Sequence, residues 1–192
     1  MHWLNIANFI EATEVEGPGL RFVIWVQGCL KRCKGCCNAD LLRIEPATLV
    51  TSGEVIQLLR QTAEKVRLEG VTFLGGEPML QADGLADIAE AARDLGLSVM
   101  IFTGYNREEI TESRFKGCNR LLNATDLLID GEFEQDNIET KRNWVGSTNQ
   151  RFHYLSDFYT SEIETRKLSV TNEWRISLQG DIVVNGLPFR IR

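Results

Sequence analysis

Four of the five cysteines in this chain of 192 residues lie within nine residues, in the stretch Cys29-Leu-Lys-Arg-Cys33-Lys-Gly-Cys36-Cys37. They follow residues 21–27, a β-branched and aromatic run that predicts a buried strand ending at Gly28. The cysteines therefore form a loop at the end of a strand. In a cytoplasmic protein such thiols are more often free groups or metal ligands than disulfides.

The spacing C-x3-C-x2-C leaves three interpretations open. Cys29, Cys33 and Cys36 can bind three irons of a four-iron, four-sulfur cluster and leave the fourth iron open for another ligand. A structural zinc site needs four closed ligands, so Cys37 or Cys118 would have to supply the fourth. Adjacent cysteines chelate one metal poorly, and Cys118 lies far along the chain. Unligated thiols are the third interpretation.

Strands and helices are predicted to alternate after this loop. Apolar runs at 71–74, 98–102 and 126–129 predict three further strands. Helical patterns begin near residue 51, with Ser52 as the expected N-cap, and span 83–95 and 107–115. This order predicts an α/β fold with a parallel sheet and right-handed crossovers.

Unusual residues follow each predicted strand, where ligands bind in sheets of this kind. Gly75-Gly76-Glu77-Pro78 follows the second strand, Thr103-Gly104-Tyr105 the third and Asp130-Gly131 the fourth. This arrangement is typical of an active site. Simpler roles stay open: the Gly-Gly pair could form a plain turn, Tyr105 could pack in the core, and Asp130 could be solvated or cap a turn. His153 is expected to be structural or at the surface.

The composition argues against nucleic-acid-binding and membrane-spanning classes of protein. The 21 basic and 27 acidic residues give a net charge of −6, which argues against a protein that chiefly binds nucleic acid. No apolar run approaches the ~18 residues of a membrane helix, and the N-terminus lacks the pattern of a signal peptide. We therefore expect a cytoplasmic protein with no membrane and no nucleic-acid partner.

The chain shows no linker or internal repeat, but its character changes after about residue 155. Residues 174–188 predict two strands joined across Gln179-Gly180-Asp181. We expect a core at 1–155 and a C-terminal extension at 156–192 that forms a β-hairpin on the core. The hairpin could cover a sheet edge or form part of a docking surface.

Several motifs occur in the order seen in a known superfamily. They are Gly17-Pro18-Gly19-Leu-Arg21, Gln27-Gly28-Cys29 through Cys36-Cys37-Asn38, Gly75-Gly76-Glu77-Pro78, Thr103-Gly104-Tyr105, Leu128-Ile129-Asp130-Gly131-Glu-Phe133 and Trp144-Val-Gly146-Ser147-Thr148-Asn149-Gln150. Over about four-fifths of its length the chain resembles the radical S-adenosylmethionine (SAM) superfamily. It is especially similar to the family that activates anaerobic (class III) ribonucleotide reductases. The resemblance implies a partial, open TIM-like β/α barrel.

The resemblance also implies cofactors and their residues. Cys29, Cys33 and Cys36 would ligate one [4Fe-4S] cluster, and SAM would chelate the open iron. Glu77 would lie near the SAM ammonium. The residues implied to contact SAM are Gly35, Cys36, Cys37, Gly75, Gly76, Glu77, Pro78, Thr103, Gly104 and Tyr105.

The implied activity is reductive cleavage of SAM to a 5′-deoxyadenosyl radical, which then generates a glycyl radical on a large partner enzyme. The expected partner is an anaerobic ribonucleoside-triphosphate reductase, and the electron would come from a donor such as flavodoxin or ferredoxin. The alternatives are modification of a ribosomally made peptide, activation of another glycyl radical enzyme, or a non-catalytic metal-binding module. Two features depart from the family: Cys37 stands where an aromatic residue is usual, and the chain continues beyond the last motif.

Overall fold

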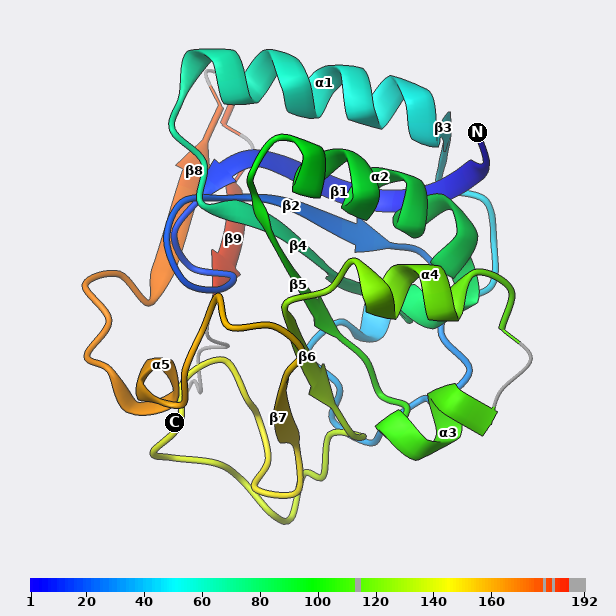
Figure 1. Ribbon diagram of the computed structural model, residues 1–192. Helices are drawn as coiled ribbons and strands as arrows, with labels where there is room; N and C mark the ends of the chain where they lie inside the picture. Colours follow the sequence, from blue (N-terminus) through cyan, green and yellow to red (C-terminus); the bar gives the residue numbers. More distant parts are fainter. Residues whose placement is uncertain (113–114, 178, 181, 187–192) are drawn as a thin grey trace.

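The computed structural model describes residues 1–112, 115–177, 179–180 and 182–186. Its main sheet has seven strands in the order β3-β1-β2-β4-β5-β6-β7 (Figure 1). Their bounds are β1 (Trp3–Thr13), β2 (Arg21–Val26), β3 (Thr48–Thr51), β4 (Gly70–Gly75), β5 (Ser98–Phe102), β6 (Leu127–Asp130) and β7 (Arg151–Tyr154). β3 and β7 lie at opposite edges, so the sheet is open.

The sheet is mixed rather than wholly parallel as predicted. β2, β4, β5 and β6 run parallel, which confirms the predicted central strands. β1, β3 and β7 pair antiparallel at the edges and were not predicted. β1 lacks a clear strand pattern in the sequence because Asn5, Asn8 and Glu11 interrupt its apolar residues and two register shifts break the two-residue period. β3 and β7 have only four residues each.

Helices cover one face of the sheet. α1 (Ser52–Lys65), α2 (Ala82–Asp94) and α4 (Cys118–Asn123) lie along this face, whereas α3 (Arg107–Glu112) lies near the ends of β5 and β6 (Figure 1). The remaining helical segments are η1 (Ala39–Leu41), η2 (Pro78–Gln81) and α5 (Glu162–Thr165). Residues 113–114 of the third predicted helix lie outside the described residues. Among those described, no helix is long and apolar enough to cross a membrane.

Thr51, not Ser52, caps α1. The Thr51 hydroxyl accepts a hydrogen bond from the Glu54 backbone N–H at 3.3 Å, and the Glu54 carboxylate accepts one from the Thr51 N–H at 2.7 Å. This reciprocal pair is a capping box. The Ser52 hydroxyl instead donates to Asp87 on α2 at 2.6 Å. The predicted cap was therefore one residue too late, because Ser and Thr are adjacent and both suit the position.

Apolar side chains fill both faces of the central strands. The larger core cluster lies under α1, α2 and α4, with Phe22, Phe73 and Leu85 fully buried. Burying each such side chain contributes about 1.5–3 kcal/mol. A second cluster on the other face joins Met100 and Ile129 to residues that follow β6. These two layers hold the central strands rigid and fix the positions of the loops that follow them.

Arg21 joins the C-terminal part of the chain to the core. Its guanidinium is fully buried and donates to the Tyr159 hydroxyl at 2.9 Å, to the Ser98 hydroxyl at 3.0 Å and to the Val71 carbonyl at 2.6 Å. The Tyr159 hydroxyl also donates to Glu69 at 2.9 Å. Segments far apart in sequence thus meet at the amino ends of β2, β4 and β5, opposite the predicted site.

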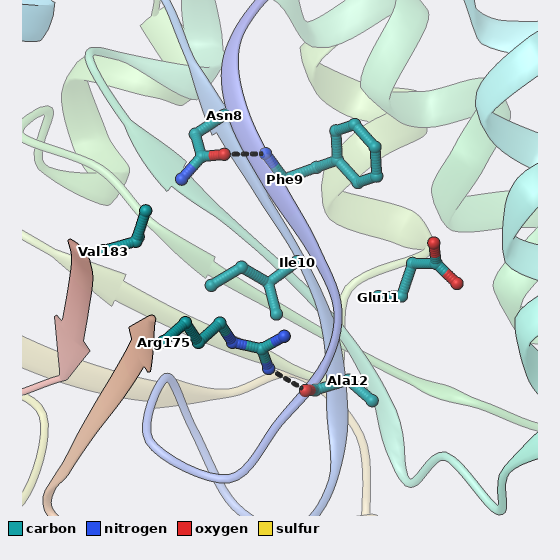
Figure 2. A pocket seen from close by; sticks show the side chains of 7 residues that line it. All are labelled: Asn8, Phe9, Ile10, Glu11, Ala12, Arg175 and Val183. Atoms are coloured by element: carbon teal, nitrogen blue, oxygen red, sulfur yellow. Dashed lines mark hydrogen bonds between the residues drawn. The ribbon is translucent and has the colours of Figure 1, made fainter. Parts of the chain in front are cut away.

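The predicted C-terminal hairpin is present. β8 (Asn172–Ile176) pairs antiparallel with β9 (Ile182–Gly186), and Asp181 of the predicted turn lies outside the described residues. The hairpin lies beside β1 across a shallow hollow, where Arg175 donates to the Ala12 carbonyl at 2.6 Å (Figure 2). On the same stretch of β1, the Asn8 side chain accepts from the Phe9 N–H at 2.9 Å. These two side chains bind backbone groups of β1 where β3 does not reach.

Candidate functional site

The four parallel strands end at the same edge of the sheet, and a loop carrying predicted site residues follows each of them. The first of these loops contains the cysteines. Gly28 begins it with φ +96°, a conformation that favours glycine, and its N–H donates to the Leu41 carbonyl at 2.8 Å. The Cys36 N–H donates to the Cys33 carbonyl at 3.2 Å. The loop is therefore tightly turned, with the three thiols on a short stretch of chain.

The thiols differ in burial. Cys29 is buried, Cys33 and Cys36 are half-buried, and Cys37 is exposed. Burial raises the pKa of Cys33, and the charges of Glu132, Cys36 and Cys29 raise it further, against a hydrogen bond from Phe133 that lowers it. A hydrogen bond with Cys37 lowers the pKa of Cys36 to about 6, while the same bond raises that of Cys37. The three predicted ligands therefore lie within electrostatic range of one another.

The donor set of this loop fits an iron–sulfur cluster, because thiolate sulfur is the usual ligand of such clusters. Among the described residues, no three His, Cys, Asp or Glu side chains are grouped to hold one metal ion. Cys29, Cys33 and Cys36 could therefore supply three thiolate ligands to such a cluster, and this assignment stays a prediction.

The Gly75-Gly76 pair packs against the base of the cysteine loop. A Cβ at Gly76 would lie 2.3 Å from the Gly28 carbonyl oxygen, and one at Gly75 would lie 2.6 Å from the Val26 nitrogen. The Glu77 N–H donates to the Gly28 carbonyl at 2.8 Å. Both glycines are therefore required for backbone to meet backbone. This close approach is to Gly28 and to the end of β2, whereas contact of the two glycines with SAM stays a prediction.

Glu77 joins the loop after β4 to the loop after β5. Its side chain is 1% exposed, and its carboxylate accepts from the Met79 N–H at 2.9 Å, the Thr103 hydroxyl at 2.7 Å and the Gly104 N–H at 2.9 Å. Burial raises the pKa of Glu77 to about 7, although these three hydrogen bonds and the charge of Lys31 lower it. The structure thus brings together Glu77, Thr103 and Gly104 at the ends of β4 and β5.

Lys31 connects the cysteine loop with the far side of the site. Its ammonium donates to both oxygens of Glu109 and to Glu132, each at 3.0 Å, and lies 4.5 Å from the centre of the Tyr105 ring. Burial lowers the pKa of Lys31, but the two carboxylates outweigh this effect and raise it. Tyr105 packs edge-on against Phe115. Its ring is therefore both a partner of Lys31 and part of the packing around the core.

Asp130 is buried, so the expectation that it is solvated is wrong. Its carboxylate accepts from Arg151 at 2.8 Å and lies 2.9 Å from His153. It also accepts from the N–H of Arg107, the first residue of α3, at 2.6 Å. That contact agrees with its predicted role at a turn. His153 is half-buried and structural, as expected.

The comparisons with known proteins agree with this geometry. Residues 15–153 match the family described as 4Fe-4S single cluster domain. The anaerobic ribonucleoside-triphosphate reductase-activating protein of Enterobacteria phage T4 is 33% identical over 158 residues, which cover 80% of this chain and 96% of that protein. The protein of the same name from Escherichia coli K12 is 28% identical over 160 residues, covering 79% of this chain and 99% of that protein.

The chain belongs to the family of anaerobic ribonucleoside-triphosphate reductase-activating proteins. Among solved structures, QueE from Escherichia coli matches 69% of this chain and 72% of its own, with a TM-score of 0.44 and 13% sequence identity. The family match at 15–153 contains all four loops of the site, whereas the β8–β9 hairpin lies outside it.

Four residues of the site in this activating protein have no role predicted from the sequence. Glu109 and Glu132 bind Lys31, Asn38 donates to the Gly75 carbonyl at 3.2 Å, and Asn149 donates to the Glu132 carbonyl at 2.8 Å. Asn38, Glu132 and Asn149 occur within the motifs that carry the resemblance, so the motifs could have indicated a role for these residues. Nothing in the local sequence marks Glu109.

Cys118 takes no part in the site. It is buried at the start of α4, and its thiol donates to the Ile110 carbonyl at 3.8 Å. Cys118 thus packs in the hydrophobic core. Gly35, in contrast, lies within the cysteine loop with φ +75°, where a Cβ would lie 2.8 Å from the side chain of Gln135.

Proposed function

We propose that this chain is a radical SAM enzyme that generates a glycyl radical on an anaerobic ribonucleoside-triphosphate reductase. Two observations support the proposal together. The chain aligns with nearly the full length of activating proteins of that name, and three cysteines lie on the loop after β2 of its matched domain. The relatives favour this function over peptide modification and over a non-catalytic metal module.

The proposal assigns a role to each loop. A [4Fe-4S] cluster bound there would supply the electron for reductive cleavage of SAM, and the 5′-deoxyadenosyl radical so formed would remove a hydrogen atom from a glycine of the partner. Cys29, Cys33 and Cys36 hold the cluster. The loops 75–78 and 103–105, together with Gly35 and Cys37, form the walls around SAM and exclude water.

Glu77 acts in this proposal through its position. Because its carboxylate already accepts three hydrogen bonds from Met79, Thr103 and Gly104, it fixes the two SAM loops at one separation. When ionised, its carboxylate would lie near the SAM ammonium. Cys37, which replaces the usual aromatic residue, leaves a less extensive packing surface for the adenine.

We also propose a fold type and a cellular setting for this enzyme. The open sheet with four parallel strands is a partial β/α barrel of the radical SAM type, with a core at 1–155 and a C-terminal extension at 156–192. The open side suits a macromolecular substrate. Five free cysteines favour the reducing cytoplasm, where a donor such as flavodoxin or ferredoxin supplies the electron.

An anaerobic assay tests the chemistry. The chain is reconstituted with iron and sulfide, mixed with SAM and a strong reductant, and assayed for 5′-deoxyadenosine. We expect product from the native chain and none from Cys33→Ala. The matched control is Cys118→Ala, which removes a thiol outside the site and should retain the product. Equal product from Cys33→Ala and the native chain would refute the assignment of the ligands.

A further inference from the structure

One side chain on the cysteine loop behaves differently from its neighbours. Leu30 is 58% exposed and Arg32 is also exposed, but the side chain of Lys31 between them is only 13% exposed. A lysine on an exposed loop normally extends into water, because its ammonium is strongly hydrated. Lys31 instead turns inward across the ends of the strands, so specific contacts must offset the lost hydration.

Those contacts come from two separate elements. Glu109 on α3 and Glu132 after β6 both accept hydrogen bonds from the Lys31 ammonium at 3.0 Å. The stem of Lys31 lies close to the loop after β5, since a Cβ at Gly104 would be 3.2 Å from its Cγ. One side chain therefore ties the cysteine loop to the loops that follow β5 and β6.

The same network reaches a predicted cluster ligand. One carboxylate oxygen of Glu132 binds Lys31, and the other lies 3.8 Å from the Cys33 sulfur. The negative charge of Glu132, so close to Cys33, disfavours negative charge on that sulfur. The Lys31 ammonium next to Glu132 offsets this effect. Lys31 and Glu132 are thus an opposed pair of charges beside one ligand.

We propose that Lys31 is a positioning residue for Cys33, and that Lys31 and Glu132 together set the reduction potential of the cluster bound there. The inference rests on the proposed function, because it takes Cys33 as a cluster ligand. Reduction adds an electron to the cluster, so a nearby positive charge favours the reduced form and a nearby negative charge opposes it.

The proposal predicts shifts of opposite sign. Lys31→Met removes the positive charge and leaves Glu132 unbalanced, so the midpoint potential of the reconstituted cluster becomes more negative. Glu132→Gln removes the negative charge but keeps an oxygen that can accept from Lys31, so the potential becomes less negative. Lys31→Arg keeps the charge and both carboxylate contacts, and it restores a potential close to that of the native chain.

Lys34 provides the matched control. It is adjacent to Cys33 in sequence and carries the same charge, but it is exposed and forms no ion pair with any described residue. Solvent screens such a charge. Lys34→Met therefore shifts the potential much less than Lys31→Met, although both variants lose one positive charge from the same loop.

The claim that Lys31 positions Cys33 is tested on the chain without iron. We measure by mass spectrometry how fast iodoacetamide alkylates Cys33, relative to Cys29 and Cys36. Loss of the Lys31 contacts frees the loop, so the rate constant of the Cys33 thiolate, taken from the pH dependence of alkylation, rises severalfold in Lys31→Met, and Lys31→Arg and Lys34→Met resemble the native chain. An unchanged rate in Lys31→Met would overturn the positional claim.

The two parts of the test separate failure of this inference from failure of the proposed function. Equal potentials in Lys31→Met and Lys34→Met, or shifts of the same sign in Lys31→Met and Glu132→Gln, would overturn the electrostatic claim. If Lys31→Met assembles no cluster, Glu132→Gln and Lys31→Arg still decide it. A native chain that binds no cluster would refute the proposed function itself, whereas the alkylation rates would still report on Lys31.

Discussion

The buried carboxyl of Glu77 makes the stability of this chain depend on pH in a specific way. Its pKa is about 7 in the folded chain because burial disfavours the charged form, against about 4.3 for an exposed glutamate. Between these two values the folded chain binds more protons than the unfolded chain. The free energy of unfolding therefore falls as the pH rises through this window and levels off above pH 7.

The size of the effect follows from the shift in pKa. Each pKa unit corresponds to about 1.36 kcal/mol, so Glu77 lowers the free energy of unfolding by about 3 kcal/mol between pH 4.5 and pH 7.5. Glu77→Gln cannot ionise and loses this dependence. It also replaces the oxygen that accepts from the Gly104 N–H, which costs about 1–3 kcal/mol at every pH.

Urea denaturation of the iron-free chain under anaerobic conditions measures this difference. The native chain and Glu77→Gln are unfolded at pH 5, 6, 7 and 8, and their free energies are subtracted so that other titrating groups cancel. We expect the native chain to lose its advantage progressively up to pH 7. Parallel profiles for the two proteins would refute the reasoning, since they would show that Glu77 ionises normally despite its burial.

Three other changes give sharp expectations. Gly76→Ala forces a Cβ to within 2.3 Å of the Gly28 carbonyl, costs about 1–3 kcal/mol and should abolish SAM binding measured by equilibrium dialysis. Gly96→Ala, where a Cβ meets nothing within 4 Å, should cost about 1–2 kcal/mol for its positive φ alone and leave binding intact. Tyr159→Phe removes the hydroxyl that binds Arg21 and should lower the free energy of unfolding in urea by about 1–3 kcal/mol; no change would show that Arg21 is satisfied by its other partners.

Much of the central fold could be predicted from the sequence because buried parallel strands are short, continuous apolar runs. β2, β4, β5 and β6 have this pattern, and α2 has a strong apolar face ended by Gly96. The edge strands lack such a signal. β1 carries polar residues and two register shifts, and β3 and β7 are too short for a periodic pattern to emerge.

The candidate site, like the fold, could be predicted only in part from the sequence. The cysteines, the Gly-Gly pair and the strand-end positions could be identified because the chemistry of these residue types is local. The connections between them could not, because they join residues far apart in the chain. Glu77 meets Thr103 across 26 positions, and Lys31 meets Glu132 across 101. Only the packing of neighbouring strands brings such pairs together.

The most direct test of the central claim is electron paramagnetic resonance of the partner enzyme. The reconstituted chain is incubated anaerobically with SAM, a reductant and the anaerobic ribonucleoside-triphosphate reductase of the same organism. We expect a glycyl radical signal on the reductase that depends on SAM and is absent with Cys33→Ala. No signal, from a chain that holds its cluster and cleaves SAM, would contradict the proposed partner and direct the search to another hydrogen donor.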